Sequence, residues 1–315
     1  MTVPDPSKTA FVFPGQGSQK VGMGKELAAT HPEAKAIFEE ADQLLGFSLS
    51  KLCWEGPETE LNETINTQPA LLVHSVAALR VFQKLQLTFQ PAYVAGHSLG
   101  EISAAVAAGA LDYDAGVKLV RRRGELMMLA GKQNPGGMAA ILGLDIETLD
   151  KICFQASSAG EVVQVANDNC PGQVVISGHS GAVQRATEAA KAAGAKRALP
   201  LAVSIAAHSP LMASAQEQFR MAVDDALIED PEIPIVGNVG ADLLKTADTI
   251  RGDLYGQLTS RVHWTGSIRK LRKLGVATFI ELGSGSVLSG LLKRIDAEAQ
   301  GMALGEPGDF EKNLA

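Results

Sequence analysis

The chain has 315 residues, of which 46% are hydrophobic and 20% are charged. This is the composition of a globular protein with a full-sized core, and it excludes disordered and collagen-like chains. The 28 basic and 35 acidic residues give a net charge of −7, which argues against a nucleic-acid-binding protein because such proteins usually show a basic domain or stripe.

The first part of the chain alternates strands with helices. The expected elements are, in order, a strand at 9–13, a Gly-rich loop at 15–19, a helical stretch from about 24 to 87 broken near 46 and 55–57, a strand at 92–95 and a helix of small residues at 101–109. Strand, sharp turn and helix in this order are typical of an α/β sheet.

A different rhythm starts after a Gly- and Pro-containing hinge at 133–137. The expected elements there are a strand at 138–144, a helix at 146–157, strands at 162–166 and 173–177, a helix at 182–193 and a strand at 195–202. The order βαββαβ matches the ferredoxin-like unit. We therefore expect residues 133–200 to form a small ferredoxin-like domain, inserted into a larger α/β domain made of residues 1–132 and 201–315.

The last part of the chain returns to the α/β pattern. The expected elements are a helix from 210, a strand near 233–236, a helix from 266, a strand at 277–282, a Gly-Ser loop at 283–286 and a further helix.

Several kinds of site are not expected in this chain. No run of about eighteen residues is free of charges and breakers, so we expect no transmembrane helix. The first ten residues lack a basic start followed by an apolar run, so we expect no signal peptide. Cys53, Cys153 and Cys170 are far apart and form no CxxC pair, so we expect no disulfide framework or zinc site and a reducing, cytoplasmic compartment.

The strongest local motif is Gly-His-Ser-Leu-Gly at 96–100. In a GxSxG turn between a strand and a helix, the serine adopts a strained conformation and its neighbours must be small. The hydroxyl then stands at a helix N-terminus, where backbone N–H groups favour developing negative charge. Ser98 is therefore the candidate nucleophile, and the alternative is an ordinary Gly-rich turn. A similar segment at 178–181 lacks the second glycine spacing and is interpreted as a turn and helix cap.

A nucleophilic serine needs a base, and histidine is the usual one near neutral pH. His208 lies in segment 204–210, just past an expected strand and before a helix, where open α/β sheets present functional groups. His97 is too close to Ser98 in sequence to reach it but can line the pocket. His74 lies among aliphatic residues and is interpreted as a core histidine. The residues alone leave the choice of His208 open.

The loop at 15–19 resembles a nucleotide-binding loop only superficially, because neither GxGxxG nor GxxxxGK[ST] is present. A Gly-rich loop that leaves a strand can still supply one backbone N–H to an oxyanion, the second coming from the residue after the nucleophile. Those two residues are Gln16 and Leu99. For Gln16 the alternative is a plain turn.

One charged residue breaks the amphipathic pattern of the helix at 116–130. On a helical wheel Arg123 lies on the apolar stripe, whereas Arg121 and Arg122 lie on the polar side. A buried guanidinium keeps its proton and is costly unless it is paired. Its partner is either an internal Asp or Glu or a carboxylate that belongs to a ligand, which Arg can bind with two parallel hydrogen bonds. The wheel leaves both possibilities open.

An ordered set of motifs resembles one known family. The motifs are FPGQGSQ at 13–19, GHSLGE at 96–101, Arg-Gly at 123–124, NCPGQVVISG at 169–178, HSPLM at 208–212 and ELG at 281–283. Together they resemble the malonyl-CoA:acyl carrier protein transacylases of type II fatty acid synthesis. The resemblance extends from Phe11 to about Arg294.

The resemblance implies a fold and a set of site residues. The implied fold is an α/β-hydrolase-like large domain with a ferredoxin-like insert. The implied roles are Ser98 as nucleophile, His208 as general base, the main-chain carbonyl of Gln257 as the group that orients His208, the amides of Gln16 and Leu99 as the oxyanion hole, Arg123 as the binding group for the malonyl carboxylate, and Asn169 as a residue near the pocket.

The implied reaction is ping-pong transfer of a malonyl group from malonyl-CoA to the phosphopantetheine thiol of acyl carrier protein. It needs no metal or organic cofactor, and we expect a monomer without membrane partners. Two departures from the family pattern are visible: Arg261 stands where a proline is frequent, and the segment at 205–207 is smaller than the often aromatic version. The second leaves acyl selectivity open, and the sequence does not distinguish fatty acid from polyketide synthesis.

Two other functions fit part of the sequence. A serine esterase or thioesterase shares the GxSxG turn and differs in letting water attack the acyl-enzyme. A catalytically silent module that binds acyl carrier protein would use basic residues such as Lys196 and Arg197, although such charges are usually solvated surface groups.

Overall fold

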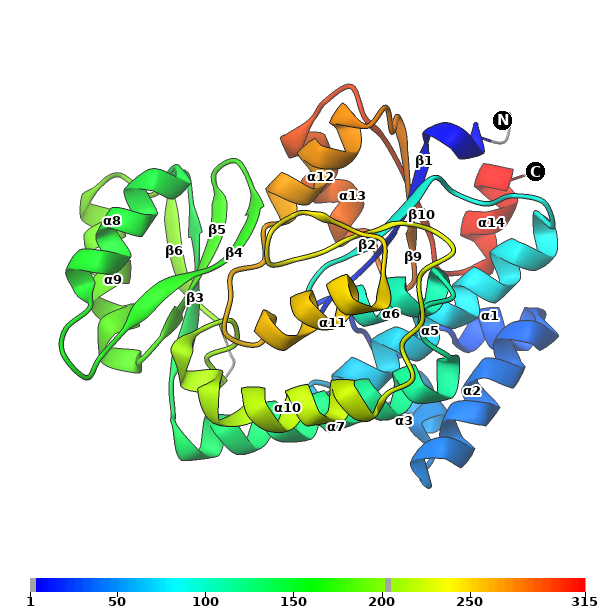
Figure 1. Ribbon diagram of the computed structural model, residues 1–315, viewed down its shortest axis with the longest axis horizontal. Coiled ribbons are helices and arrows are strands. Elements are labelled where there is room, and N and C mark those ends of the chain that lie inside the picture. The colour runs from blue at the N-terminus through cyan, green and yellow to red at the C-terminus, as the bar shows by residue number, and fades with distance from the viewer. Residues whose placement is uncertain (1–3, 202–204, 315) are drawn as a thin grey trace.

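A six-stranded sheet forms the centre of the computed structural model, which describes residues 4–201 and 205–314 (Figure 1). Its strand order is β10-β9-β1-β2-β7-β8, and neighbouring strands are parallel except for β7 with β8. The strands are β1 (Thr9–Phe13), β2 (Tyr93–Gly96), β7 (Ile235–Val236), β8 (Leu243–Leu244), β9 (Thr278–Leu282) and β10 (Gln300–Leu304).

Both faces of the central strand β1 are covered. Phe11 and Phe13 point into one core cluster, and Ala10 and Val12 point into another, because successive side chains of a strand face opposite sides. The second cluster also contains apolar residues of α12 (Trp264–Lys273) and α13 (Val287–Ile295). Burial on both faces explains why β1 is apolar without alternation.

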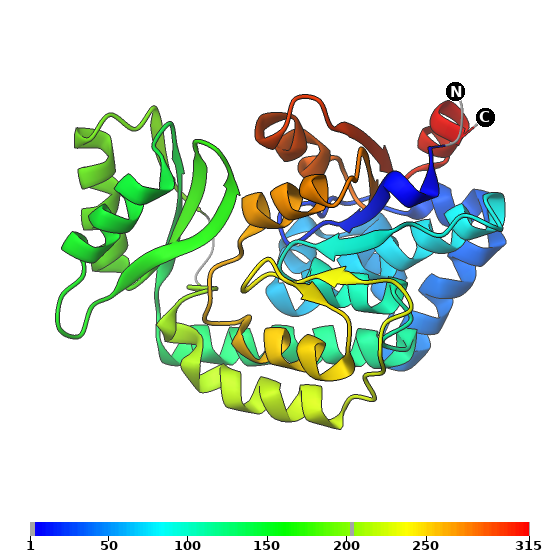
Figure 2. The same cartoon turned by 45° about the horizontal axis from the view of Figure 1, so that its top comes forward.

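Most of the other helices contribute to the core on the Phe11 and Phe13 face (Figure 2). They are α1 (Lys25–Thr30), α2 (Pro32–Leu45), α3 (Leu49–Glu55), α4 (Glu58–Leu61), α5 (Thr64–Leu85), α6 (Gly100–Ala107), α7 (Tyr113–Gln133), α10 (Ala213–Asp225), α11 (Ala247–Gly256) and α14 (Pro307–Leu314). None of the helices in the described ranges has the length and apolar run that crossing a bilayer requires.

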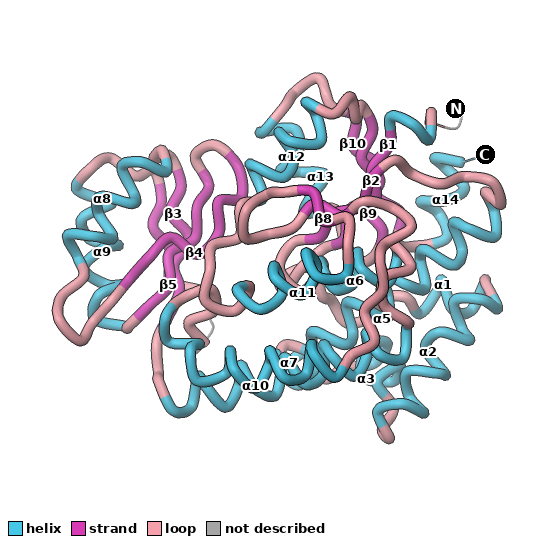
Figure 3. The backbone as a smooth tube through the Cα atoms, in the orientation of Figure 1, coloured by secondary structure: helices cyan, strands magenta, loops and turns pink. Residues whose placement is uncertain are grey.

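A second, four-stranded antiparallel sheet lies beside the first (Figure 3). Its elements are β3 (Gly137–Leu142), α8 (Ile146–Ala156), β4 (Val163–Cys170), β5 (Gln173–Gly178), α9 (Ser180–Ala192) and β6 (Arg197–Pro200), with strand order β4-β5-β3-β6. Apolar residues of α8 and α9 share a separate core with this sheet. Strand β4 contacts α12 and α13, and Asn167 of β4 forms a parallel bridge with Val262.

The element order expected from the sequence agrees with the structure over most of the chain. The strand expected at 195–202 corresponds to β6, which starts at Arg197 and ends at Pro200. Residue 202 of that strand, and residue 204 of the segment before His208, lie outside the described ranges. The helix expected from residue 210 starts with a single 3₁₀ turn, Pro210–Met212, before α10. In the described residues five elements were not anticipated: the 3₁₀ turn Pro6–Lys8, β8, α11, β10 and α14.

Candidate active site

Ser98 lies in the sharp turn between β2 and α6, as the GxSxG motif predicts. Its φ of 53° is in the left-handed region, which non-glycine residues seldom adopt and which is often found at functional sites. The turn is tight: a Cβ at Gly96 would lie 1.9 Å from the backbone of Gly100, and one at Gly100 would lie 2.2 Å from the carbonyl oxygen of Phe13. Only glycine fits at these two positions.

Asn238 holds this turn from the neighbouring strand. It follows β7, which pairs with β2, and is 2% exposed. Its Oδ1 accepts from the main-chain N–H of Ser98 at 2.8 Å, and its Nδ2 donates to the carbonyl of Gly96 at 2.8 Å. One amide side chain therefore satisfies both a donor and an acceptor of the strained turn.

His208 reaches Ser98 from the chain segment before α10. Its Nε2 lies 2.9 Å from Ser98 Oγ, and its Nδ1 lies 2.8 Å from the carbonyl of Gln257 and 3.1 Å from that of Ser260. Because a carbonyl only accepts, Nδ1 bears the proton and the Nε2 lone pair faces the hydroxyl. His208 also has a positive φ, 58°, and Gln164 Nε2 donates to its carbonyl at 2.8 Å.

The environment of His208 disfavours its charged form. Burial, and then the charge of Arg123, lower the pKa of His208 to about 3, since a second positive charge in a dry site is unfavourable. The imidazole is therefore neutral near pH 7, and its Nε2 lone pair is available to accept the proton of Ser98 Oγ.

Arg123 of α7 is 1% exposed, as the helical wheel predicts. Its Nε donates to Gln257 Oε1 at 3.0 Å, Nη1 to Gln68 Oε1 at 2.9 Å and Nη2 to Ser98 Oγ at 3.2 Å. Burial lowers the pKa of Arg123 to about 10, so the group stays charged at neutral pH. Within the described residues no carboxylate forms an ion pair with it, and its hydrogen bonds to protein go to neutral groups.

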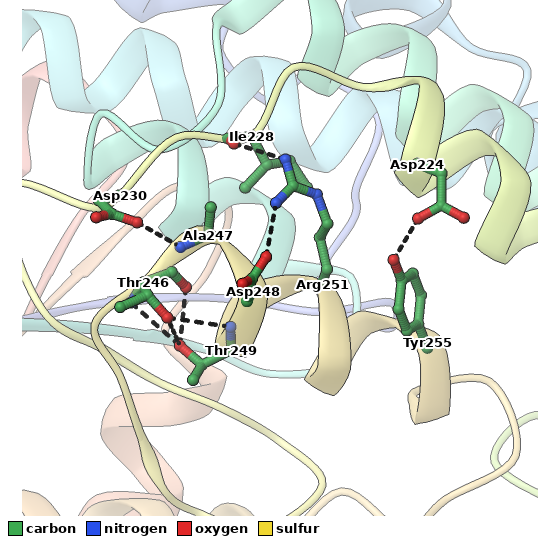
Figure 4. A network of polar contacts seen from close by, with 9 residues as sticks. All are labelled: Asp224, Ile228, Asp230, Thr246, Ala247, Asp248, Thr249, Arg251 and Tyr255. Carbon is green, nitrogen blue, oxygen red and sulfur yellow. Dashed lines mark hydrogen bonds and ion pairs between the residues drawn. The ribbon is translucent and has the colours of Figure 1, made fainter.

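Gln257, at the C-terminal end of α11, contacts both His208 and Arg123. The helix that positions it is anchored at both ends (Figure 4). Thr246 and Thr249 form a reciprocal capping box at its start, which satisfies main-chain N–H groups that a helix leaves free. Near its end, the hydroxyl of Tyr255 donates to Asp224 of α10.

Two main-chain amides point to an oxyanion-binding role. Gln16 follows β1 and Leu99 follows Ser98, and both residues line the same cavity as Ser98. Neither N–H has a hydrogen-bond acceptor among residues 4–201 and 205–314. The Gln16 side chain turns away and donates to Thr64 Oγ1 at 3.1 Å. Two free amides just beyond the ends of adjacent strands are the donors that an oxyanion hole requires.

His97 does not contact the hydroxyl of Ser98, in agreement with the sequence argument. Its Nε2 lies 2.8 Å from Asn169 Oδ1 of β4, and burial lowers the pKa of His97. Both residues line the cavity, so the contact joins the two sheets at the site.

A cavity of about 190 Å³ brings these residues together. Seven of the eight site residues predicted from the sequence line it, and Gln257 lies directly behind Arg123 and His208. The lining residues are Gln16, Thr64, His97, Ser98, Leu99, Arg123, Met127, Met138, Asn167, Asn169, Val175, Leu201, Ile205, Ala207 and His208. In the described part of the chain, no group of three or more His, Cys, Asp or Glu side chains could hold a metal ion.

Sequence reasoning missed four residues that support the site: Gln68, Glu101, Gln164 and Asn238. Glu101 and Gln257 share a hydrogen bond of 2.9 Å, and Gln68 contacts Arg123. Gln68 and Glu101 occur in buried helices, where a polar residue is itself a signal. Gln164 and Asn238 show no comparable signal, because only the folded chain places them next to the turn.

Comparisons with a family model and with known proteins agree on one family over most of the chain. The acyl transferase domain family matches residues 10–304. The malonyl CoA-acyl carrier protein transacylase of Bacillus subtilis (strain 168) is 48% identical over 305 residues, covering 97% of this chain and 96% of that protein. The protein of the same name from Escherichia coli (strain K12) is 47% identical over 298 residues, covering 95% and 96% of the two chains.

Solved structures are similar over nearly the whole chain. The acyl carrier protein S-malonyltransferase of Vibrio cholerae superposes with a TM-score of 0.94 at 45% identity, covering 97% of this chain and 99% of that one. A malonyl-transacylase in complex with a type II PKS acyl-carrier protein gives a TM-score of 0.94 at 43% identity, covering 98% and 99%. The mixed α/β fold with two sheets is thus shared with these proteins.

Proposed function

Since this chain belongs to the acyl transferase domain family, and within it to the malonyl CoA-acyl carrier protein transacylases, we propose that Ser98, His208 and Arg123 are the residues with which it transfers malonyl groups from malonyl-CoA to acyl carrier protein. The observation that supports these roles is the convergence of three groups on one atom. Ser98 Oγ lies 2.9 Å from His208 Nε2 and 3.2 Å from Arg123 Nη2.

In the first half-reaction, Ser98 Oγ attacks the thioester carbonyl of malonyl-CoA while His208 Nε2 takes the hydroxyl proton. The carbonyl oxygen becomes an oxyanion that accepts hydrogen bonds from the amides of Gln16 and Leu99. The C–S bond then breaks, His208 returns the proton to the sulfur, and CoA leaves as the thiol. The product is a malonyl ester of Ser98.

In the second half-reaction, the phosphopantetheine thiol of acyl carrier protein gives its proton to His208 and attacks the ester. The C–O bond to Ser98 breaks, and the serine oxygen regains the proton. The same base and the same two amides serve both steps. Arg123 holds the free carboxylate of the malonyl group through its two terminal nitrogens, which keeps the thioester carbon next to Ser98.

Intact-mass measurement after incubation with malonyl-CoA tests the assignment. The unchanged chain should gain one malonyl increment, and Ser98→Ala should gain none, because the hydroxyl group next to His208 has been removed. A malonyl increment retained by Ser98→Ala would contradict the role of Ser98.

The second half-reaction is tested by adding acyl carrier protein that bears its phosphopantetheine arm. Malonyl should move from the enzyme to the carrier thiol. Release of free malonate in its place would indicate a thioesterase, in which water rather than the thiol attacks the ester.

We also propose the finer description of the fold and location. The βαββαβ order of the four-stranded sheet supports a ferredoxin-like domain at 133–200. The parallel central sheet, with its nucleophile in a strand-to-helix turn, supports an α/β-hydrolase-like domain at 1–132 and 201–315. Three separate, buried, unpaired cysteines support a reducing, cytoplasmic location.

A further inference from the structure

Glu101 is a buried carboxyl group that the proposed reaction does not use. It lies in the first turn of α6, directly behind the nucleophile, and is 1% exposed. Its Oε2 accepts from Gln257 Nε2 at 2.9 Å. Its Oε1 has no hydrogen-bond partner among the described residues that could donate to it. A buried oxygen without a partner is unusual and needs a physical reason.

Asp253 of α11 bears on this oxygen, because it lies close enough to Glu101 to raise the pKa of its carboxyl group. A second negative charge beside a buried carboxyl group is unfavourable, so the neutral form of Glu101 is favoured. Asp253 Oδ2 accepts from the main-chain N–H groups of Asn238 at 3.0 Å and Val239 at 3.2 Å. In the described residues, by contrast, no main-chain N–H donates to Glu101, whose Oε1 lacks any donor. Glu101 Oε1, which has no donor in the described residues, is therefore the oxygen that can carry a proton.

This arrangement fixes the orientation of the Gln257 amide. Nε2 of Gln257 donates to Glu101 and to the carbonyl of Ser98, the latter at 3.1 Å. The amide oxygen is then left to accept from Arg123 Nε at 3.0 Å. If the amide were reversed, an N–H would face the N–H of the guanidinium. Since the main chain of Gln257 also holds His208, Glu101 acts through one residue on both the base and Arg123.

We propose that Glu101 is a neutral positioning residue, which donates a hydrogen bond to Asp253, accepts one from the Gln257 amide and thereby leaves Arg123 without an internal counter-ion. The guanidinium charge is then balanced by the carboxylate of the substrate, so Glu101 contributes to selectivity for a dicarboxylic acyl group. This inference rests on the proposed function of the site.

The charged surroundings of Glu101 agree with a neutral group. Burial, and then the nearby Asp253, raise the pKa of Glu101 well above its ordinary value. The positive charge of Arg123 and the N-terminus of α6 act in the opposite direction. Arg123 does not contact Glu101 directly, because the Gln257 amide stands between them.

Two substitutions at position 101 test the proposal through rescue by the isosteric amide. Glu101→Gln keeps a donor toward Asp253 and an acceptor for Gln257, as the protonated acid does, whereas Glu101→Ala removes both. The rate of malonyl-Ser98 formation should stay within about threefold in Glu101→Gln. In Glu101→Ala it should fall on the order of tenfold to a hundredfold, with a lower malonyl-to-acetyl preference, because Arg123 and His208 lose their fixed support.

Either of two kinetic results would overturn the proposal. Equal losses in Glu101→Gln and Glu101→Ala would mean that an ionised carboxylate is required. Full activity and unchanged preference in Glu101→Ala would mean that Glu101 positions nothing.

An infrared difference spectrum tests the protonation state even if Glu101→Ala does not fold. Near neutral pH, the spectrum of the unchanged chain minus that of Glu101→Gln should contain the C=O band of a protonated carboxyl group. Loss of an ionised carboxylate band in its place would refute a neutral Glu101. This measurement does not depend on malonyl transfer, so a failure of the Ser98→Ala test and a failure here are distinguishable.

Discussion

Arg123 is held by neutral partners, and this decides what the pocket can bind. The amide oxygens of Gln68 and Gln257 accept two of its N–H groups and fix the plane of the guanidinium without cancelling its charge. A buried charge that lacks a counter-ion is costly, and an acyl group with a free carboxylate relieves that cost. An acyl group without one leaves the charge unbalanced, so on the proposed role of Arg123 we expect the site to reject it.

Replacement of Arg123 should therefore change selectivity more than catalysis in general. In Arg123→Ala we expect kcat/KM for malonyl-CoA to fall at least about a hundredfold, because the carboxylate loses its charged, two-point partner. The value for acetyl-CoA should change far less. Arg123→Lys is the matched control. Its kcat/KM for malonyl-CoA should lie between those of the unchanged chain and Arg123→Ala, since lysine keeps the charge but not the planar guanidinium group. An unchanged ratio of malonyl to acetyl transfer in Arg123→Ala would rule out this role.

The site residues that could be predicted from the sequence are those with an unusual local pattern around them. Ser98 follows from its two glycines, and Arg123 from a charge on the apolar side of a helix. His208 needed the family resemblance to become more than one of several histidines. Asn238 and Gln164 could not be predicted, because an amide side chain is unremarkable in a loop or strand until the fold places it against a particular turn.

At the scale of elements, the site depends on how closely α6 approaches β1. The N-terminal turn of α6 packs against the end of β1 with no room for a side chain at Gly100. This close approach brings the Ser98 turn next to the Gln16 loop, which follows β1. The spacing of the two amides proposed for the oxyanion hole is thus set by helix and strand packing rather than by the loops alone.

A methyl group at Gly100 should separate these two elements. In Gly100→Ala the added Cβ would lie 2.2 Å from the carbonyl oxygen of Phe13, so we expect the free energy of unfolding to fall by about 2–3 kcal/mol and malonyl-Ser98 formation to be strongly impaired. Urea unfolding measures the first effect.

Gly252→Ala provides the control for that experiment. Gly252 lies in α11 and has no heavy atom within 4 Å of an added Cβ. Alanine there should raise helix stability by about 0.5–1 kcal/mol. Similar losses in both variants would contradict the packing argument.

The elements that sequence missed are those with weak local signals. β8 has only two residues, and β10 contains a glycine and is partly exposed. Helix α11 contains two glycines, which lower helix propensity; its capping box and its contact with α10 compensate. The strongly apolar strands β1 and β9, in contrast, have the bounds expected within one residue.

At the scale of the whole molecule, burial of neutral histidines makes stability depend on pH. Burial lowers the pKa of His74 to about 4, and burial together with Arg123 lowers that of His208 to about 3. The unfolded chain binds these protons below about pH 6.5, and the folded chain does not. The contribution of these histidines to the free energy of unfolding should therefore be nearly constant above pH 6.5. It should fall as the pH falls from 6.5 toward 4.

His74 allows this to be tested away from the active site. It is fully buried in α5, and its Nε2 lies 2.9 Å from the carbonyl of Gly305. Between pH 6.5 and 5.5, His74→Gln should lose about 1 kcal/mol less stability than the unchanged chain, because the unfolded imidazole goes from about half to about nine-tenths protonated while the folded one stays neutral. Urea unfolding at the two pH values measures the difference. Parallel losses in both proteins would show that His74 titrates alike in the folded and unfolded states.

The pairing of β1 with β9 has a consequence for synthesis on the ribosome. Thr9 lies opposite Thr278 in the central sheet, and His208 takes its orientation from the carbonyls of Gln257 and Ser260. A nascent chain emerges from its N-terminus, so the serine is made long before the groups that activate it. A polypeptide arrested before residue 257 should be inert toward CoA thioesters, which delays acylation until synthesis is nearly complete.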